Sequence, residues 1–256
     1  RERSKMKLLI CGKGGAGKST VAALMAMAME KQGKHVLLVD ADESKIGLYR
    51  MLGLPTPAPL MENLGGKKGF QEKTRGTGLG GPTPLFRPGM TVDALPDDVI
   101  AKKGGLRVIS TGKILHFGEG CACPMGRLFN LLFASLDLAD QDLVIVDTAA
   151  GLEHFGRRLD SQVDRVVCVV APSYESVIMA RRARTLAAEA GLPLCVILNR
   201  TTPQVAQEMA EALEDLDILG HIPENSGLFL NTLRGEVLDF GVPEMDRICR
   251  ALADRF

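Results

Sequence analysis

The stretch Leu8-Leu9-Ile10-Cys11-Gly12-Lys13-Gly14-Gly15-Ala16-Gly17-Lys18-Ser19-Thr20 decides the fold of this chain. Residues 8–11 form an apolar run typical of a buried strand, and residues 21–25 continue with the apolar spacing of a helix. Between them, the spacing G-x-x-x-x-G-K-[ST] is typical of a phosphate-binding loop that joins a strand to a helix. The sequence therefore predicts an α/β domain that binds a nucleotide.

The loop offers groups for each part of a nucleotide's phosphate chain. Its glycines let successive N–H groups converge on phosphate oxygens, and the helix that follows adds a favourable dipole. We expect Lys18 to reach the terminal phosphates, the Ser19 hydroxyl to bind Mg²⁺ and Thr20 to contact the α-phosphate. The predicted phosphate contacts are Gly12, Lys13, Gly14, Gly15, Ala16, Gly17, Lys18, Ser19 and Thr20.

Lys13 is one lysine more than the motif requires. With it, the loop resembles the deviant Walker A signature K-G-G-x-G-K-[ST] of the superfamily that contains MinD, ParA and the nitrogenase iron protein. The resemblance implies that Lys13 crosses a two-fold interface to the nucleotide of a second copy, so that an ATP-bound homodimer completes catalysis in trans. A solvated loop lysine without this role is the alternative.

Short apolar runs recur along the chain, and helical patterns lie between most of them. Such alternation predicts a mostly parallel sheet that helices cover on both faces. We predict one α/β P-loop NTPase domain over residues 6–256 with about seven strands, and residues 1–5 as an N-terminal extension or an expression remnant. The predicted strands cover residues 8–11, 36–39, 108–110, 143–146, 166–170, 196–198 and 218–222.

Residues 53–105 interrupt this alternation, because they are rich in Gly, Pro and Lys. Long irregular segments in compact domains are typically lids, binding loops or disordered stretches. We expect short helices and a mobile surface here, with basic side chains that are solvated.

Carboxylates follow two of the predicted strands. Asp40 and Asp42 come after the strand at 36–39, and in an extended segment both can face the same side. Resemblance to deviant Walker A ATPases implies that Asp42 orients the attacking water and that Asp40 supports the Mg²⁺ shell. Asp147 is expected to hold a water on Mg²⁺, and Gly151 to act as a switch II hinge. Ordinary loop or N-cap acids are the alternative for the first pair.

Two further strand ends are predicted to hold the adenine base. Asn199 and Arg200 follow one strand, at the place where the superfamily has an adenine-binding asparagine. Pro223 and Glu224 follow the last strand and match a second adenine-contacting loop. Asn after a strand is also an ordinary turn residue. A run of the type N-K-x-D is absent, which argues against GTP.

Cys121 and Cys123 form a C-x-C pair whose thiols face the same way in an extended segment and can chelate a soft or borderline metal. Two thiolates leave a tetrahedral ion half-ligated, so a two-fold axis beside the loop would complete a Cys₄ site for Zn²⁺ or Ni²⁺. Two incidental buried cysteines are the alternative. The remaining cysteines lie in apolar patterns and are expected to be buried: Cys11, Cys168, Cys195 and Cys249.

The run Gly118-Glu119-Gly120-Cys121-Ala122-Cys123-Pro124, together with Gly151-Leu152-Glu153-His154, resembles the CooC branch of this superfamily. The resemblance runs from Met6 to near the C-terminus. It implies a nickel-insertion ATPase, dependent on Mg²⁺, whose partner is carbon monoxide dehydrogenase. Ala149 stands where that branch is expected to have an acidic residue, so another metalloenzyme remains open as the client.

Two other functions stay open on the sequence. A reductase like the nitrogenase iron protein would need cysteines for an iron–sulfur cluster, and residues 148–164 contain none. A positioning ATPase like MinD or ParA would bind membrane or DNA. The chain has 31 basic residues (lysine plus arginine) and 31 acidic residues (aspartate plus glutamate), a balance that predicts no nucleic-acid or membrane partner.

The amphipathic stripe near the C-terminus is better explained by packing on the sheet than by membrane binding. The absence of a signal-peptide pattern predicts a cytoplasmic protein. The stripe consists of Met245, Ile248, Cys249, Leu252 and Phe256.

Overall fold

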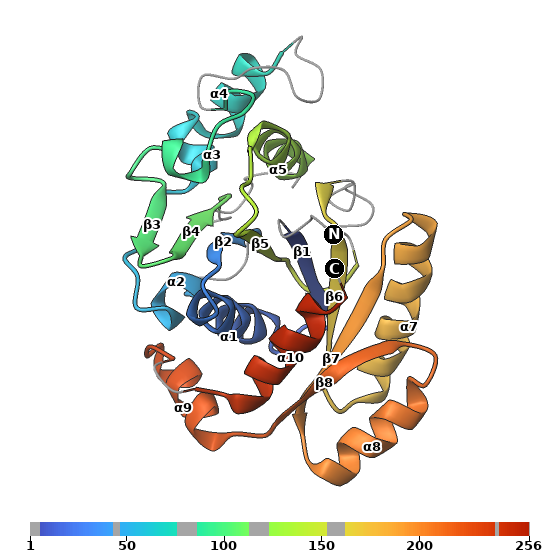
Figure 1. Ribbon diagram of the computed structural model, residues 1–256. Coiled ribbons are helices and arrows are strands. Elements are labelled where there is room, and N and C mark those ends of the chain that lie inside the picture. Colours follow the sequence, from blue (N-terminus) through green and yellow to red (C-terminus); the bar gives the residue numbers. More distant parts are fainter. Residues whose placement is uncertain are drawn as a thin grey trace.

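The computed structural model describes residues 6–42, 47–75, 86–112, 123–152, 162–238 and 241–255. They are built around one eight-stranded sheet, in the order β3-β4-β2-β5-β1-β6-β7-β8 (Figure 1). All neighbouring strands run parallel except β3 and β4. The strands are β1 (Met6–Gly12), β2 (His35–Asp40), β3 (Ile100–Lys103), β4 (Leu106–Ser110), β5 (Asp142–Asp147), β6 (Arg165–Val170), β7 (Leu194–Thr201) and β8 (Asp217–Pro223).

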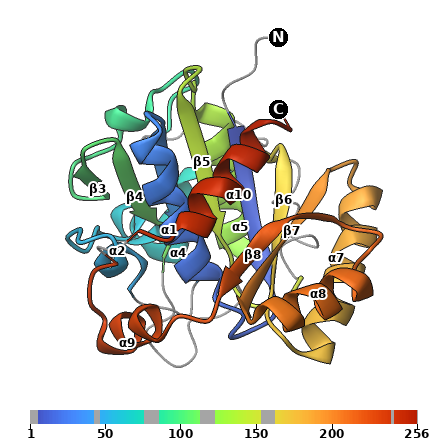
Figure 2. The ribbon, with the colours of Figure 1, turned by 60° about the horizontal axis from the view of Figure 1, so that its bottom comes forward.

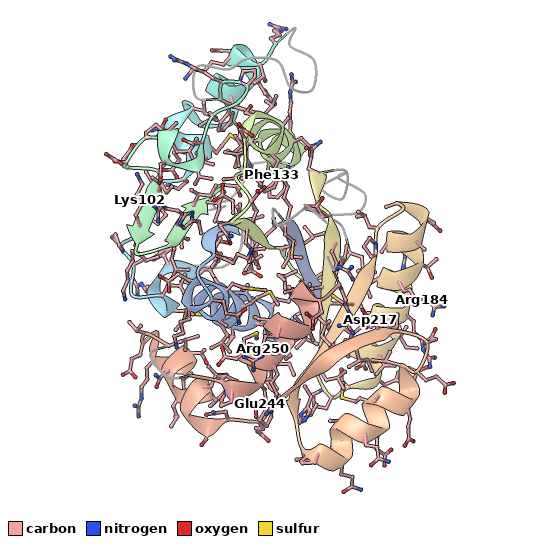
Figure 3. The ribbon with its side chains drawn as sticks, viewed as in Figure 1. Lys102, Phe133, Arg184, Asp217, Glu244 and Arg250 are labelled. Atoms are coloured by element: carbon pink, nitrogen blue, oxygen red, sulfur yellow. The ribbon has the colours of Figure 1, made fainter. Side chains whose placement is uncertain are left out.

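The seven strands predicted from apolar runs are confirmed, and the predicted number is short by one. The additional strand, β3, lies inside the segment 53–105 that was expected to be irregular. Ile100 and Ala101 are buried, whereas Lys102 and Lys103 are exposed, so the strand has neither a full apolar run nor an alternating pattern. It pairs only with β4, and Lys102 lies at the edge of the molecule (Figure 3), where lysine discourages further strand pairing.

The rest of the described segment 53–105 also departs from the expected mobile surface. Its short helices α3 (Leu60–Asn63) and α4 (Gly66–Lys73) are present as predicted. However, Leu60, Leu64 and Phe70 are buried in the same apolar cluster as the sheet. These buried side chains stand among many glycines and lysines, and through them the two helices pack on the rest of the protein.

Helices cover both faces of the sheet, which explains why the parallel strands are apolar along their length. On one face lie α1 (Lys18–Lys31) and α10 (Pro243–Ala253), side by side in Figure 2. The stripe on α10 packs there, as predicted: Met245, Ile248, Cys249 and Leu252 are buried, and Phe256 is outside the described residues. The opposite face carries α5 (Cys123–Ser135), α7 (Tyr174–Glu189) and α8 (Pro203–Ala212). The other helices in the described part of the chain are α2 (Leu48–Met51), η1 (Val92–Ala94) and α9 (Ser226–Arg234).

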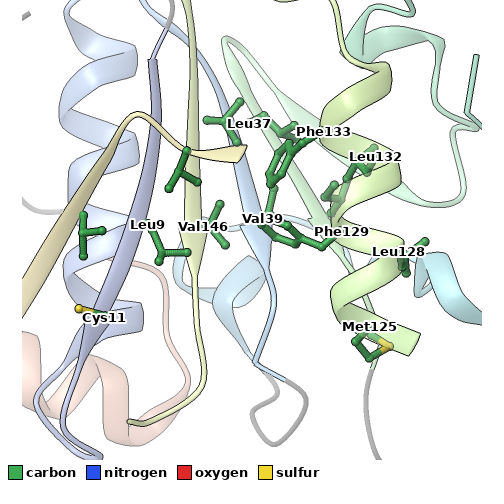
Figure 4. Close-up of a cluster of buried hydrophobic side chains, with 14 of the residues drawn as sticks. Leu9, Cys11, Leu37, Val39, Met125, Leu128, Phe129, Leu132, Phe133 and Val146 are labelled. Atoms are coloured by element: carbon green, nitrogen blue, oxygen red, sulfur yellow. The ribbon is translucent and has the colours of Figure 1, made fainter. Parts of the chain in front are cut away.

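An aromatic pair attaches α5 to the sheet. Phe129 and Phe133 are buried, with ring centroids 4.2 Å apart and planes at 83°. Figure 4 shows both rings pointing from α5 toward the strands that carry Val39 and Val146. An edge-to-face pair adds a directional contact to the apolar burial. The two rings therefore hold the C-terminal half of α5 against the sheet.

An ion pair holds the end of α10 against the edge of the sheet. Arg255 donates to both carboxylate oxygens of Asp217, at 2.7 and 2.8 Å. Asp217 lies at the start of β8 (Figure 3), and these hydrogen bonds hold its pKa below the usual range. Among the described residues, no helix is both long and apolar enough to cross a bilayer.

Candidate nucleotide site

The glycine-rich loop lies at the carboxyl end of β1, the strand next to the middle of the sheet. Gly12 has φ +138°, and a Cβ there would lie 2.3 Å from the Val169 carbonyl oxygen. Gly17 has φ +92°, and its Cβ would lie 2.4 Å from Asn199 Nδ2. Both positions therefore favour glycine, because a Cβ would collide with the backbone of β6 at Gly12 and would displace the Asn199 amide at Gly17.

Lys18 and Ser19 begin α1 directly behind the loop. The side chain of Lys18 is buried, and its Nζ donates to the Lys13 carbonyl oxygen at 3.3 Å. The Ser19 Oγ is buried and has no hydrogen-bond partner among the residues that the structure describes. A buried hydroxyl without a partner costs about 1–3 kcal/mol, which a bound ligand would offset. The loop is thus arranged to receive an oxygen-rich group.

Three carboxylates lie beside the loop at the ends of β2 and β5. Asp40, Asp42 and Asp147 are each at most 2 % exposed. Asp40 and Asp147 are direct partners in the sheet register, so their side chains share one face, that of α1. The Asp42 N–H donates to Asp40 Oδ1 at 3.3 Å. Buried carboxylates beside a serine hydroxyl are the oxygen ligands that Mg²⁺ prefers, so the residues present fit this ion.

The segment after β5, which the sequence predicts to be a switch, is hydrogen-bonded to the glycine-rich loop and to β1. The Gly151 N–H donates to the Gly12 carbonyl oxygen at 3.3 Å, and Thr148 Oγ1 donates to the Ile10 carbonyl oxygen at 2.7 Å. Gly151 has φ +98°, which suits the hinge predicted from the sequence. Glu153 and His154 lie outside the described residues.

Lys13 has a partner that the sequence did not predict. Its Nζ lies 3.2 Å from Glu175 Oε2, and Glu175 is in the first turn of α7. A backbone N–H and the Lys13 ammonium together hold the pKa of Glu175 below its usual range. An acidic residue in a first helical turn is a detectable sequence signal, but its partner is 162 residues away.

The four predicted adenine contacts meet in one cavity of about 160 Å³. Asn199 Nδ2 donates to the Ala16 carbonyl oxygen at 2.8 Å, and Arg200 Nη1 donates to the Gly15 carbonyl oxygen at 3.1 Å. Arg200 also has φ +61°, an uncommon backbone conformation outside glycine that is often found at functional sites. The lining residues are Thr20, Asn199, Arg200, Pro223, Glu224, Asn225, Leu228, Phe229 and Thr232.

Helix α9 provides a wall of this cavity that was not predicted from the sequence. Leu228, Phe229 and Thr232 come from this helix, and Asn225 caps it by accepting from the Leu228 N–H at 2.9 Å. An asparagine directly after Pro223 and Glu224 is a helix-start signal, so the helix itself was predictable. The face of α9 that lines the cavity was not predictable, because it depends on how β8 is placed beside β7.

With the site described, comparison with known proteins identifies its family. The family model of the CobQ/CobB/MinD/ParA nucleotide-binding domain, CbiA, matches residues 8–238. The chain belongs to this MinD/ParA family. Three similar proteins illustrate the likeness.

An uncharacterized ATP-binding protein of Methanocaldococcus jannaschii is 36% identical over 247 residues, covering 96% of this chain and 99% of that protein. The carbon monoxide dehydrogenase accessory protein CooC of Rhodospirillum rubrum is 30% identical over 232 residues, covering 87% of this chain and 85% of that protein. The crystal structure of the cell division ATPase MinD of Pyrococcus furiosus matches with a TM-score of 0.70 at 19% identity. The match covers 98% of this chain and 99% of the MinD chain. The last likeness shows that the chain has the MinD/ParA fold.

The cysteines of this MinD/ParA-family chain fall into two groups. Cys11, Cys168, Cys195 and Cys249 are buried, as predicted. A hydrogen bond with Cys168, together with burial, raises the pKa of the Cys11 thiol, and burial raises the pKa of Cys195 and Cys249 to about 12. Buried thiols of this kind stay protonated and are unsuited to bind a metal at neutral pH.

The predicted metal ligands form the second group, and most of their surroundings lie outside the described residues. Cys121 is not among these residues, and Cys123 is the first residue of α5, with a side chain that is not described. Gly112, just after β4, lies against Met125 of α5, since a Cβ on Gly112 would be 2.9 Å from Met125 Cε. The N-terminal end of α5 is therefore at the same edge of the sheet as the glycine-rich loop. Within the described ranges, no group of three or more His, Cys, Asp or Glu side chains is placed to hold a metal ion.

Proposed function

We propose that this chain is a Mg²⁺-dependent ATPase whose ATP-bound homodimer carries Ni²⁺ or Zn²⁺ on Cys121 and Cys123 and delivers it to carbon monoxide dehydrogenase or a related metalloenzyme. The observation that carries the proposal is the position of α5, which begins at Cys123, the second residue of the C-x-C pair. The start of this helix lies at the edge of the sheet where β1 passes into the glycine-rich loop. The 30% identity to CooC along 85% of that protein supports the same function.

The nucleotide would lie across the loop, with its base in the cavity beside α9. The Asn199 amide N–H₂ already donates to Ala16, which leaves its carbonyl oxygen to accept from the base. Adenine offers an exocyclic amino group to such an acceptor, whereas guanine presents a carbonyl at the same position. This arrangement favours ATP over GTP, with Arg200, Pro223 and Glu224 completing the cavity.

The catalytic groups follow from the buried polar side chains. Ser19, Asp40 and Asp147 would hold Mg²⁺, which neutralises phosphate charge when bound. Asp42 would orient the attacking water, and Lys18 would contact the terminal phosphates. Lys13 of the second copy would add positive charge where negative charge develops during transfer of the phosphoryl group. Gly151 would let the switch segment respond to the γ-phosphate.

The first experiment measures metal content, stoichiometry and oligomeric state of protein purified without oxygen, in the presence of ATP and of ADP. We expect one Ni²⁺ or Zn²⁺ per two chains, lost in the Cys121→Ala/Cys123→Ala variant, which still binds ATP. The control is Cys195→Ala, which removes a buried thiol and should keep the metal. Iron with sulfide would replace the proposal by a reductase or a cluster scaffold.

The role of Lys13 is tested separately. Lys13→Ala should bind ATP as the parent chain does, because the remaining loop groups are intact. Its turnover should fall at least about a hundredfold, because a positive charge delivered in trans contributes strongly to phosphoryl transfer. Steady-state ATPase assays beside Lys31→Ala, an exposed lysine at the end of α1, measure this. Ordinary turnover in Lys13→Ala would overturn the assignment.

A positioning ATPase of the MinD or ParA kind is the second candidate. The similarity of fold across nearly the whole MinD chain favours it. Paired cysteines have no part in such a function. Protein that contains no metal under the conditions above, in both nucleotide states, would support this candidate in place of the metallochaperone.

A further inference from the structure

We propose that the first turn of α7 is part of the surface on which a second copy of this chain docks, and that Glu175 competes with the partner's nucleotide for Lys13. The inference rests on the ATP-bound homodimer of the proposed function. Beyond the dimer itself, the inference identifies the surface that the second copy covers and the contact within each chain that opposes dimer formation.

The length of the Lys13 side chain limits where the second copy can dock. Lysine has a four-carbon stem, so phosphates held by a second copy have to come within about 6 Å of the Lys13 backbone. Glu175 Oε2 already lies 3.2 Å from Lys13 Nζ. Any chain that receives Lys13 therefore approaches the first turn of α7 as well. A two-fold axis makes the contact reciprocal, so each copy presents the same turn.

The turn has the side chains of an interface. Tyr174 is 77% exposed and Ile178 is 42% exposed, one residue before Glu175 and three after it. Residues four apart lie on the same side of a helix, so these two form a small apolar surface beside the charged pair. Exposed tyrosine is enriched where proteins bind one another, because its ring offers a large contact area and its hydroxyl tolerates water. A second copy drawn in by Lys13 would bury both.

The Lys13–Glu175 pair opposes this docking without preventing it. Side-chain exposures of 38% and 67% make it a solvent-exposed ion pair, which is weak. The Lys13 ammonium cannot form a close ion pair with Glu175 and with the partner's phosphates at the same time. The free energy of the pair in the single chain is therefore subtracted from dimer formation. Removing Glu175 should strengthen the dimer, and removing the apolar side chains should weaken it.

The test measures the dimer dissociation constant by analytical ultracentrifugation with Mg²⁺ and a non-hydrolysable ATP analogue. Tyr174→Ser/Ile178→Ser should raise the constant by about tenfold or more, as expected for an aromatic residue within an interface. Glu175→Gln should lower it by roughly two- to thirtyfold, because the symmetric dimer breaks two such exposed ion pairs. Binding of the analogue to the single chain, measured at low protein concentration, should stay unchanged in both.

Matched controls separate the surface from general effects. Glu189→Gln removes the same charge from the other end of α7, and Leu233→Ser removes a side chain that is 70% exposed on α9. Both should dimerise like the parent chain. Parent-like dimers of the Tyr174/Ile178 variant, or weaker dimers of Glu175→Gln, would overturn this inference while leaving the ATP dimer intact. A parent chain that stays monomeric with the analogue would overturn the proposed dimer itself.

Discussion

At the scale of single residues, contacts around the glycine-rich loop decide what each position tolerates. Gly17 is enclosed by the Asn199 side chain, which in turn holds the Ala16 carbonyl oxygen. The cavity beside α9 and the glycine-rich loop therefore share one set of contacts. Arg200, with its positive φ, adds a second link to the same loop at Gly15. A change at either end of this network should affect nucleotide binding more than folding.

Gly17→Ala should therefore weaken ATP binding by at least about tenfold, because its Cβ would displace the Asn199 amide from Ala16. Gly33→Ala is the matched control, since Gly33 also has positive φ but a Cβ there would meet no other atom within 4 Å. Both changes should lower the free energy of unfolding by about 1 kcal/mol from backbone strain. Titration calorimetry and urea unfolding measure the two effects, and equal ATP affinities would contradict the prediction.

The buried thiols predict a dependence of stability on pH. Cys195 and Cys249 have pKa values raised from 9.0 to about 12 by burial. Between these values the unfolded chain releases thiol protons that the folded chain keeps, so rising pH favours unfolding. The contribution of these two thiols to the free energy of unfolding is fully present below pH 9 and is lost as the pH rises toward 12. Urea unfolding at about pH 8 and about pH 10.5 should show a smaller fall for Cys195→Ala/Cys249→Ala than for the parent chain. Equal falls would contradict this assignment.

At the scale of elements, local signals mark where helices begin, and packing decides where they lie. Ser173 and Thr202 cap α7 and α8 through hydrogen bonds to backbone N–H groups three residues on. These caps are visible in the sequence. The position of α5 is set instead by Phe129 and Phe133 against the sheet. Since α5 begins at Cys123, this packing holds the helix that starts at the second cysteine of the predicted pair.

Phe129→Ala should lower the free energy of unfolding by about 3–5 kcal/mol, because the ring is fully buried and leaves a cavity. A double-mutant cycle with the milder Phe129→Leu and Phe133→Leu changes should give a coupling of about 0.5–1.5 kcal/mol for the edge-to-face contact. Urea unfolding measures both. The exposed Phe229 provides the control, since Phe229→Ala should change stability by less than about 0.5 kcal/mol. A coupling near zero would show that the rings act only through burial.

At the scale of the whole molecule, the proposed sites share one edge of the sheet. The glycine-rich loop, the carboxylates after β2 and β5, and the start of α5 all lie at the carboxyl ends of parallel strands. Ligands of open α/β sheets bind at this edge. A dimer that forms across it would bring nucleotide and metal sites of both copies together, so the two ligands are expected to affect each other.

If ATP and Ni²⁺ both favour the same dimer, each should raise the affinity of the other by one common factor, typically about 5–150-fold. Calorimetric titrations of Ni²⁺ with the ATP analogue or ADP bound, and of the analogue with or without Ni²⁺, measure both directions. In Cys121→Ala/Cys123→Ala, Ni²⁺ should leave the affinity for the analogue unchanged. Metal affinity that does not depend on the nucleotide would contradict the coupling.

The sequence by itself determined the strand–loop–helix unit at residues 8–25, seven of the eight strands and the burial of the C-terminal stripe. These depend on apolar periodicity and on turn residues, which act over a few neighbouring positions. Resemblance to deviant Walker A ATPases, and not apolar periodicity, pointed to the residues at the ends of β7 and β8 that line the cavity.

Only the tertiary structure decided the antiparallel edge strand β3, the wall that α9 gives to the cavity at the ends of β7 and β8, and the partner of Lys13. Each depends on residues far apart in the chain: β3 owes its conformation to pairing with β4, and Lys13 meets Glu175 across 162 positions. Such contacts follow from the order of strands in the sheet and from which helix faces are left at its edge. No local pattern contains that information, because the free energy of these contacts arises only when distant segments pack together.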